Sequence, residues 1–134
     1  MARIIVIDDE RDIRNVVKEV LVREGYDVVV AEDGEAGLDA LREHGADLVI
    51  TDVIMPGKDG VETVYDIRME FPNTRVLVIS GGGNVPPHEY EPVAIKTSAY
   101  LASATVAGAD TTLTKPFGRK ELIDAVSELL DGAG

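Results

Sequence analysis

Short apolar runs alternate with stretches of helical periodicity along this chain. Residues 4–7 are apolar and β-branched throughout, which is typical of a strand that is buried on both faces. The next stretch has the apolar spacing of one helix face, and Gly25 ends it. The residues of that face are Ile13, Val16, Val17, Val20 and Leu21. The same alternation continues, and it predicts strands at residues 4–7, 28–31, 48–51, 75–79 and 111–114.

Helices are predicted between these strands and after the last one. Asp33 is the predicted N-cap of the second helix, which ends near residue 45. Three residues are assigned to the core side of the third helix: Val61, Val64 and Tyr65. An alanine-rich fourth helix is predicted over residues 93–107, and a final amphipathic helix carries apolar residues between 122 and 130.

Five strands that alternate with helices predict an α/β fold. The connections are too long for hairpins, so the strands form a parallel sheet with helices on both faces, a doubly wound (βα)5 arrangement. We expect one domain over residues 1–134, without a second, output domain. Residues 81–92 hold three glycines and three prolines, and they predict a loop longer than this architecture requires.

The composition narrows the class of partner. The formal net charge of −12 opposes binding to nucleic acid, whose phosphates require clusters of lysine and arginine. The chain has no cysteine and no apolar run near the ~20 residues that span a bilayer. We therefore expect a cytoplasmic protein that binds neither a membrane nor nucleic acid.

Polar residues follow four of the predicted strands directly. Asp8 and Asp9 follow the first strand, Asp52 the third, Ser80 the fourth and Lys115 the fifth. Because the carboxyl ends of parallel strands meet at one edge, these side chains are expected to gather there. Acids brought together favour a hard cation such as Mg²⁺, and a carboxylate is itself a nucleophile toward phosphorus. The pattern indicates phosphoryl transfer to Asp52, with Ser80 and Lys115 contacting the phosphoryl group.

Four motifs together resemble the receiver domain of bacterial two-component response regulators. They are the acidic pair after the first strand, the segment DVIMPGKDG around Asp52, the step Ser80-Gly81 and the run Lys115-Pro116-Phe117. The resemblance covers essentially the whole chain. It implies a flavodoxin-like, CheY-like fold with strand order 2-1-3-4-5, and a cis peptide bond between Lys115 and Pro116.

The resemblance also implies roles for individual residues. Asp52 is then the phosphoacceptor, and Asp9 and Asp52 hold Mg²⁺ through their side chains. Ile54 contributes its backbone carbonyl, and Asp8 acts through water. Receivers often carry an aromatic switch residue three positions before the lysine, where this chain has Thr112, so the usual form of that switch is in question.

The implied partners are proteins. A histidine kinase or a histidine phosphotransfer protein supplies the phosphoryl group, and the domain catalyses only its own phosphorylation and dephosphorylation. A downstream partner reads the face formed by the helix at 93–107, the fifth strand and the last helix, or the phosphoryl group passes along a phosphorelay. We expect a monomer or a weak homodimer that signals by contact.

Three other interpretations stay open. The chain is a degenerate receiver that only binds proteins, or remotely a haloacid-dehalogenase-like phosphatase in which Asp8 is the nucleophile. A flavodoxin-like cofactor binder shares the fold, but acids after the first strand would repel its phosphate. Two of the site residues also have simpler alternative roles: Asp9 as the cap of the first helix, and Asp52 as part of a turn.

Overall fold

The computed structural model of the chain describes residues 2–52, 60–80, 108–114 and 117–131. Its strands are β1 (Arg3–Ile7), β2 (Asp27–Ala31), β3 (Leu48–Asp52), β4 (Arg75–Ser80) and β5 (Thr111–Thr114). Its helices are α1 (Arg11–Arg23), α2 (Gly34–His44), α3 (Gly60–Glu70) and α5 (Arg119–Asp131). The loop predicted over 81–92 and the helix predicted over 93–107 lie outside the described residues.

All five strands form one parallel sheet in the order β2-β1-β3-β4-β5. The α/β class, the strand order and the five predicted strands are confirmed. The structure extends β1 back to Arg3, β2 back to Asp27, β3 forward to Asp52 and β4 forward to Ser80. Each predicted strand was therefore right in place and short by at most one residue at one end.

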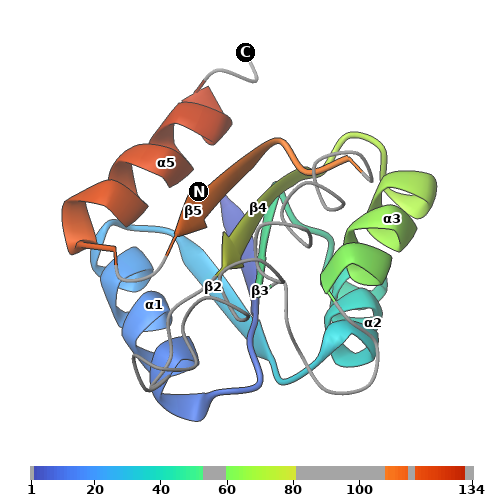
Figure 1. The fold of residues 1–134 in the computed structure, drawn as a ribbon, viewed down its shortest axis with the longest axis horizontal. Coiled ribbons are helices and arrows are strands. Elements are labelled where there is room, and N and C mark those ends of the chain that lie inside the picture. Colours follow the sequence, from blue (N-terminus) through green and yellow to red (C-terminus); the bar gives the residue numbers. More distant parts are fainter. Residues whose placement is uncertain (1, 53–59, 81–107, 115–116, 132–134) are drawn as a thin grey trace, which may run out of the picture.

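Helices cover both faces of this sheet. In Figure 1, α1 and α5 lie on one side of the strands, and α2 and α3 lie on the other. Successive side chains of a strand point to opposite faces, so β1 sends Ile4 and Val6 toward α1 and α5 while Ile5 and Ile7 face α2 and α3. Both apolar layers are fully buried, which is why β1 is apolar at consecutive positions.

Two helix predictions are confirmed in part. The Asp33 side chain caps α2 by accepting a hydrogen bond from Ala36 N at 2.8 Å. Val64 is buried on the core side of α3, but Tyr65 is 54% exposed, and Val16 of α1 is 58% exposed. The assignment of Tyr65 to the core side was wrong, and the apolar face that includes Val16 extends beyond the part of α1 that is buried. An i, i+3, i+4 pattern is wider than the strip of helix that the sheet covers.

An arginine of α3 anchors the start of β5. The Arg68 guanidinium donates to the carbonyl oxygens of Gly108 and Thr74, both at 2.7 Å, and pairs with the Asp110 carboxylate. Asp110 in turn accepts from Val76 N of β4 at 2.7 Å. Gly108 has φ +123°, and a Cβ there would overlap the Arg68 side chain. The bonds thus tie α3, β4 and the entry to β5 into one unit.

No helix in the described part of the chain is long and apolar enough to cross a membrane.

The contact of α2 with β1 depends on the absence of a side chain at Gly37. A Cβ at this position would overlap Cδ1 of Ile7. We expect Gly37→Ala to lower the free energy of unfolding by about 1–2 kcal/mol, since overpacking outweighs the gain in helix propensity. Urea unfolding measures this. Ile7→Val removes Cδ1, the nearest overlapped atom, and keeps Cγ1, so the overlap is relieved only in part. The double variant should still lose less than the sum of the single losses, and strict additivity would contradict the contact.

Loss of the Arg68 side chain leaves partly buried carbonyl groups without a donor. Arg68→Met is expected to lower the free energy of unfolding by about 2–3 kcal/mol. The control is Arg23→Met, because Arg23 makes only an exposed pair with Glu19 among the described residues, worth about 0.3–0.5 kcal/mol. Equal losses in chemical denaturation would show that the Arg68 bonds contribute no more than a surface pair.

Candidate functional site

The carboxyl edge of the sheet collects the predicted site residues of the first and third strands. Ile7 pairs with Thr51 in the parallel register, so Asp8 and Asp52 leave neighbouring strands at the same level. Asp52 is the last residue of β3, pairs with Ile79 and is 7% exposed. The Thr51 hydroxyl donates to the Asp52 carbonyl at 3.1 Å. Asp52 is therefore a buried residue of the sheet. The alternative role of Asp52 in a turn concerns residues 53–59, which lie outside the described residues.

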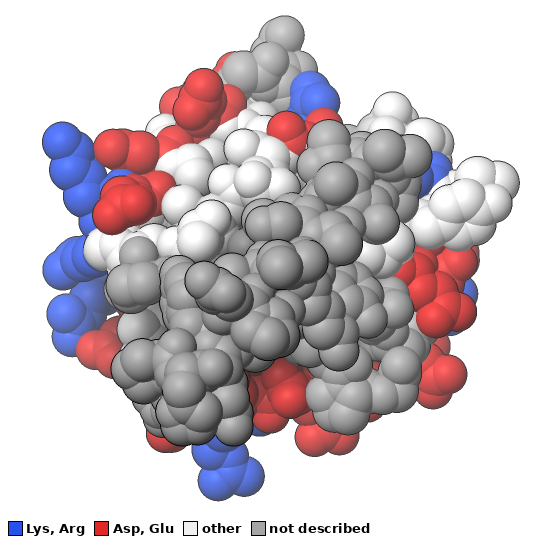
Figure 2. Space-filling view, in the orientation of Figure 1, with Lys and Arg blue, Asp and Glu red and all other residues white. Residues whose placement is uncertain are grey.

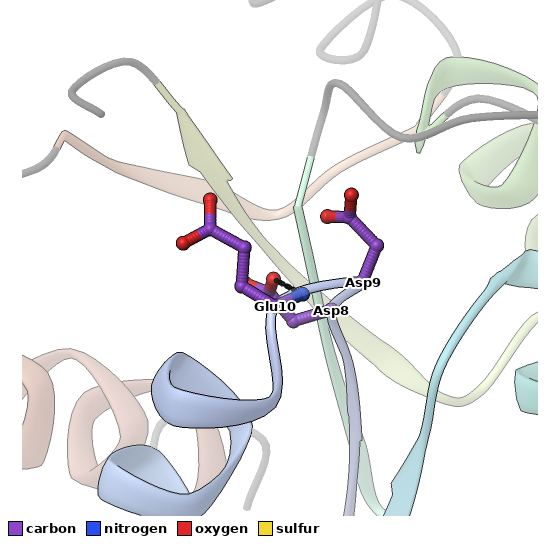
Figure 3. A group of neighbouring side chains, drawn as sticks. All are labelled: Asp8, Asp9 and Glu10. Carbon is purple, nitrogen blue, oxygen red and sulfur yellow. Dashed lines mark hydrogen bonds between the residues drawn. The ribbon is translucent and has the colours of Figure 1, made fainter. Parts of the chain in front are cut away.

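Three consecutive acids after β1 converge. Asp8, Asp9 and Glu10 each place one carboxylate oxygen within 4.8 Å of the others. Asp8 is buried, at 2% exposed, whereas Asp9 and Glu10 are open to solvent. Figure 3 shows the side chains of Asp9 and Glu10 on the two sides of the turn that leads from β1 into α1. The group offers oxygen ligands at an accessible position of the sheet edge.

The turn itself is built on Asp8. Its amide donates to Ala31 O of β2 at 3.1 Å, and its Oδ1 accepts from Glu10 N at 2.9 Å, drawn as the dashed line in Figure 3. Glu10 is the N-cap residue of α1, and no side chain makes a capping bond there. Asp9 is thus not the cap of the first helix, which removes the alternative role considered for it.

The donor set fits Mg²⁺. This ion accepts one or two carboxylates together with waters and phosphate oxygens, and it prefers hard oxygen ligands. The structure supplies the acids Asp8, Asp9 and Glu10, with Asp52 on the neighbouring strand. A cation there would offset the mutual repulsion of these carboxylates. The expected ligand Ile54 lies outside the described residues.

The other predicted site residues are only partly described. Ser80 ends β4 and pairs with Thr114, so its backbone lies at the same edge as Asp52. Lys115 and Pro116 directly follow β5 but lie outside the described residues, as does the peptide bond between them. Thr112 lies on β5 beside Val78 and is exposed. The contacts of Ser80 and Lys115 with a phosphoryl group remain predictions.

The charges of the described surface are unevenly distributed. In Figure 2, basic side chains gather on the side where Figure 1 has α1 and α5, and acidic side chains border much of the rest. The basic residues of these two helices are Arg11, Arg14, Lys18, Arg23, Arg119 and Lys120. Helices α2 and α3 together carry six acidic residues and only two arginines. A charged partner would therefore approach the two sides with different electrostatic energy.

Sequence reasoning missed two residues near the acids. Glu10 was not among the predicted ligands, although its carboxylate completes the group of three. Three acids in a row were the available signal. Arg14 of α1 donates to the carbonyl oxygen of Asp8 at 2.6 Å, and nothing in the sequence pattern singles it out.

Comparison with known proteins identifies the family to which this chain is similar. The family model described as response regulator receiver domain matches residues 4–127. The transcriptional regulatory protein CpxR of Escherichia coli K12 is 34% identical over 130 residues, which are 97% of this chain and 50% of CpxR. CpxR of Klebsiella pneumoniae shows the same figures. The chain thus spans about half the length of these curated relatives.

Solved structures agree with the sequence comparison. The chemotaxis protein CheY4 of Vibrio cholerae has a TM-score of 0.80 and 28% identity, over 97% of this chain and 99% of CheY4. The receiver domain of NtrX from Brucella abortus has a TM-score of 0.79 and 32% identity, over 96% of this chain and 98% of that domain. The chain has the CheY-like fold, and it belongs to the response regulator receiver domain family.

Proposed function

We propose that this chain accepts a phosphoryl group on Asp52 with the help of Mg²⁺ and signals by the resulting change in shape and charge. One observation carries the proposal. The acids Asp8, Asp9 and Glu10 converge at the end of β1, and the buried Asp52 ends the neighbouring strand at the same level. In a member of the receiver family, this arrangement supplies both a cation site and a nucleophile.

The chemistry is a phosphoryl transfer from phosphohistidine. Bound Mg²⁺ would neutralise charge on the phosphoryl oxygens. The groups that would hold it are the side chains of Asp8, Asp9 and Asp52 and the backbone carbonyl of Ile54. An oxygen of Asp52 attacks phosphorus, the bond between phosphorus and the donor imidazole breaks, and that imidazole takes a proton from solvent. Ser80 and Lys115 hold the transferred group. The chain catalyses only its own phosphorylation and, later, the attack of water on its own aspartyl phosphate, which restores the Asp52 carboxylate and releases inorganic phosphate.

The donor and the receiver of the signal are proteins. A histidine kinase or a histidine phosphotransfer protein presents the phosphoryl group in the cytoplasm. The modification adds a charge of about −1.5 to −2, which biases the segments after β4 toward a second arrangement. A downstream partner then reads the face formed by residues 93–107, β5 and α5, or the group moves on in a phosphorelay. The chain acts as a monomer or a weak homodimer.

The acceptor is tested by intact mass after incubation with acetyl phosphate. We expect one Mg²⁺-dependent phosphoryl adduct on the natural chain and none on Asp52→Asn, which keeps the shape of the side chain but removes the nucleophile. Asp39→Asn on the exposed side of α2 is the control for loss of one acid and should form the adduct. A folded, Mg²⁺-binding chain without adduct would instead favour a degenerate receiver, and continuous phosphate release that requires Asp8 would favour a phosphatase.

The cation site is tested separately by isothermal titration with Mg²⁺. Asp9→Asn removes one charged oxygen ligand and is expected to weaken Mg²⁺ binding by at least about tenfold. Asp12→Asn removes the same charge from an exposed position in the first turn of α1 and should change the affinity by less than about twofold. Equal effects of the two substitutions would mean that only the overall charge matters, and would contradict a role of Asp9 as ligand.

A further inference from the structure

Every polar group of the Asp8 residue is bound by a different part of the molecule. Its amide is held by β2, through Ala31 O, and its carboxylate by the amide of Glu10. Its carbonyl oxygen accepts a hydrogen bond of 2.6 Å from Nη1 of Arg14. The first two bonds are those of a strand end and a tight turn, whereas the third requires a long charged side chain from the second turn of α1.

The bond from Arg14 acts on the peptide group between Asp8 and Asp9. A peptide group is planar, so fixing the Asp8 carbonyl also fixes the direction of the Asp9 amide and limits where the Asp9 side chain can leave the backbone. Arg14 is partly buried, and its own amide bonds to Glu10 O at 3.0 Å. Arg14 therefore contacts the backbone on both sides of Asp9.

The Arg14 guanidinium binds a backbone carbonyl group, not a carboxylate. The chain has 25 acidic residues, yet the bond recorded for the Arg14 guanidinium goes to a neutral carbonyl within the acidic turn. Rigid support of ligands by groups outside the ligand set is common in metal sites, where it keeps the donor atoms at the geometry the ion needs. Removing such support lowers affinity although every ligand is still present.

We propose that Arg14 is a positioning residue of the cation site: it fixes the Asp8–Asp9 peptide and so keeps the three acidic side chains together before the ion binds. This inference rests on the proposed function, because it assumes that Asp8 and Asp9 hold Mg²⁺. Arg14 contacts neither the ion nor the phosphoryl group in this role.

An electrostatic role of Arg14 and a positioning role predict opposite effects of removing its side chain on Mg²⁺ affinity. An arginine close to the acids repels Mg²⁺, so a purely electrostatic role predicts tighter Mg²⁺ binding once the positive charge is lost. A positioning role predicts weaker binding, because the acids no longer stay at the required separation. The matched control is Arg11, which lies on the same helix one turn nearer the acids, is exposed, and makes no recorded hydrogen bond or ion pair among the described residues.

The experiment titrates Mg²⁺ into the natural chain, Arg14→Met, Arg14→Lys and Arg11→Met, by calorimetry and by the NMR shift of the Glu10 amide. We expect Arg14→Met to raise the Kd for Mg²⁺ about tenfold and to speed hydrogen exchange at Glu10 N, with Arg14→Lys recovering part of the affinity. Arg11→Met should leave the Kd unchanged or lower it by less than about threefold.

The outcomes separate the two proposals. No Mg²⁺ binding by the natural chain would overturn the proposed function, and this inference with it. Normal binding by the natural chain, with equal or tighter binding by Arg14→Met, would overturn the positioning role alone. Urea unfolding checks that each variant is folded in the titration buffer. If Arg14→Met is unfolded, Arg14→Gln takes its place with the same expected direction, and an unchanged Kd for Arg14→Gln would equally overturn the role.

Discussion

The parallel pairing of β1 with β3 is the constraint on which the rest of this structure depends. Because Ile7 lies beside Thr51, the residues that follow these strands reach the same edge at the same level, and a shift of one position would send Asp52 to a different height and the neighbouring side chains to the opposite faces. The register is held by burial on both faces, since the strand residues of β1 and β3 are covered by α1 and α5 on one side and by α2 and α3 on the other. The packing of apolar side chains on the two faces of the sheet thus fixes the position of the acidic residues at its carboxyl edge.

The two edges of the sheet use their charges differently. At the amino edge, charged residues are paired: Arg3 binds Asp27 at 2.8 Å, and Arg75 lies 3.8 Å from Asp110, which also pairs with Arg68. These pairs link neighbouring strands to each other and to α3. At the carboxyl edge, Asp8, Asp9 and Glu10 bring like charges together, which costs free energy unless a cation offsets it. Such local conflict between electrostatics and folding is typical of functional sites. The proposed Mg²⁺ site and the proposed support by Arg14 both follow from this edge.

Sequence patterns were most reliable where one local rule acted alone. Asp33 caps α2 as its residue type and position predicted, and the uniformly apolar run 4–7 is buried on both faces. The patterns were less reliable where the outcome depends on how much of a helix the sheet covers. Val16 and Tyr65 have the right spacing for a core, but both lie more than half exposed at the margin of the covered strip. The third acid, Glu10, was visible in the sequence, but its oxygen reaches the other two only because the turn after β1 is tightened by the Asp8 side chain.

By itself, the sequence determined the α/β class, the order of the elements and the strand ends from which the acids and Ser80 emerge, because each of these follows from local periodicity and from the polarity of adjacent residues. Only the tertiary structure decided which groups meet. The placement of Gly37 against Ile7, the reach of Arg68 to the entry of β5 and the bond from Arg14 to Asp8 O join residues on different elements or in different turns. No local pattern specifies such contacts, since they depend on the packing of whole elements and on the rotamers that this packing leaves open.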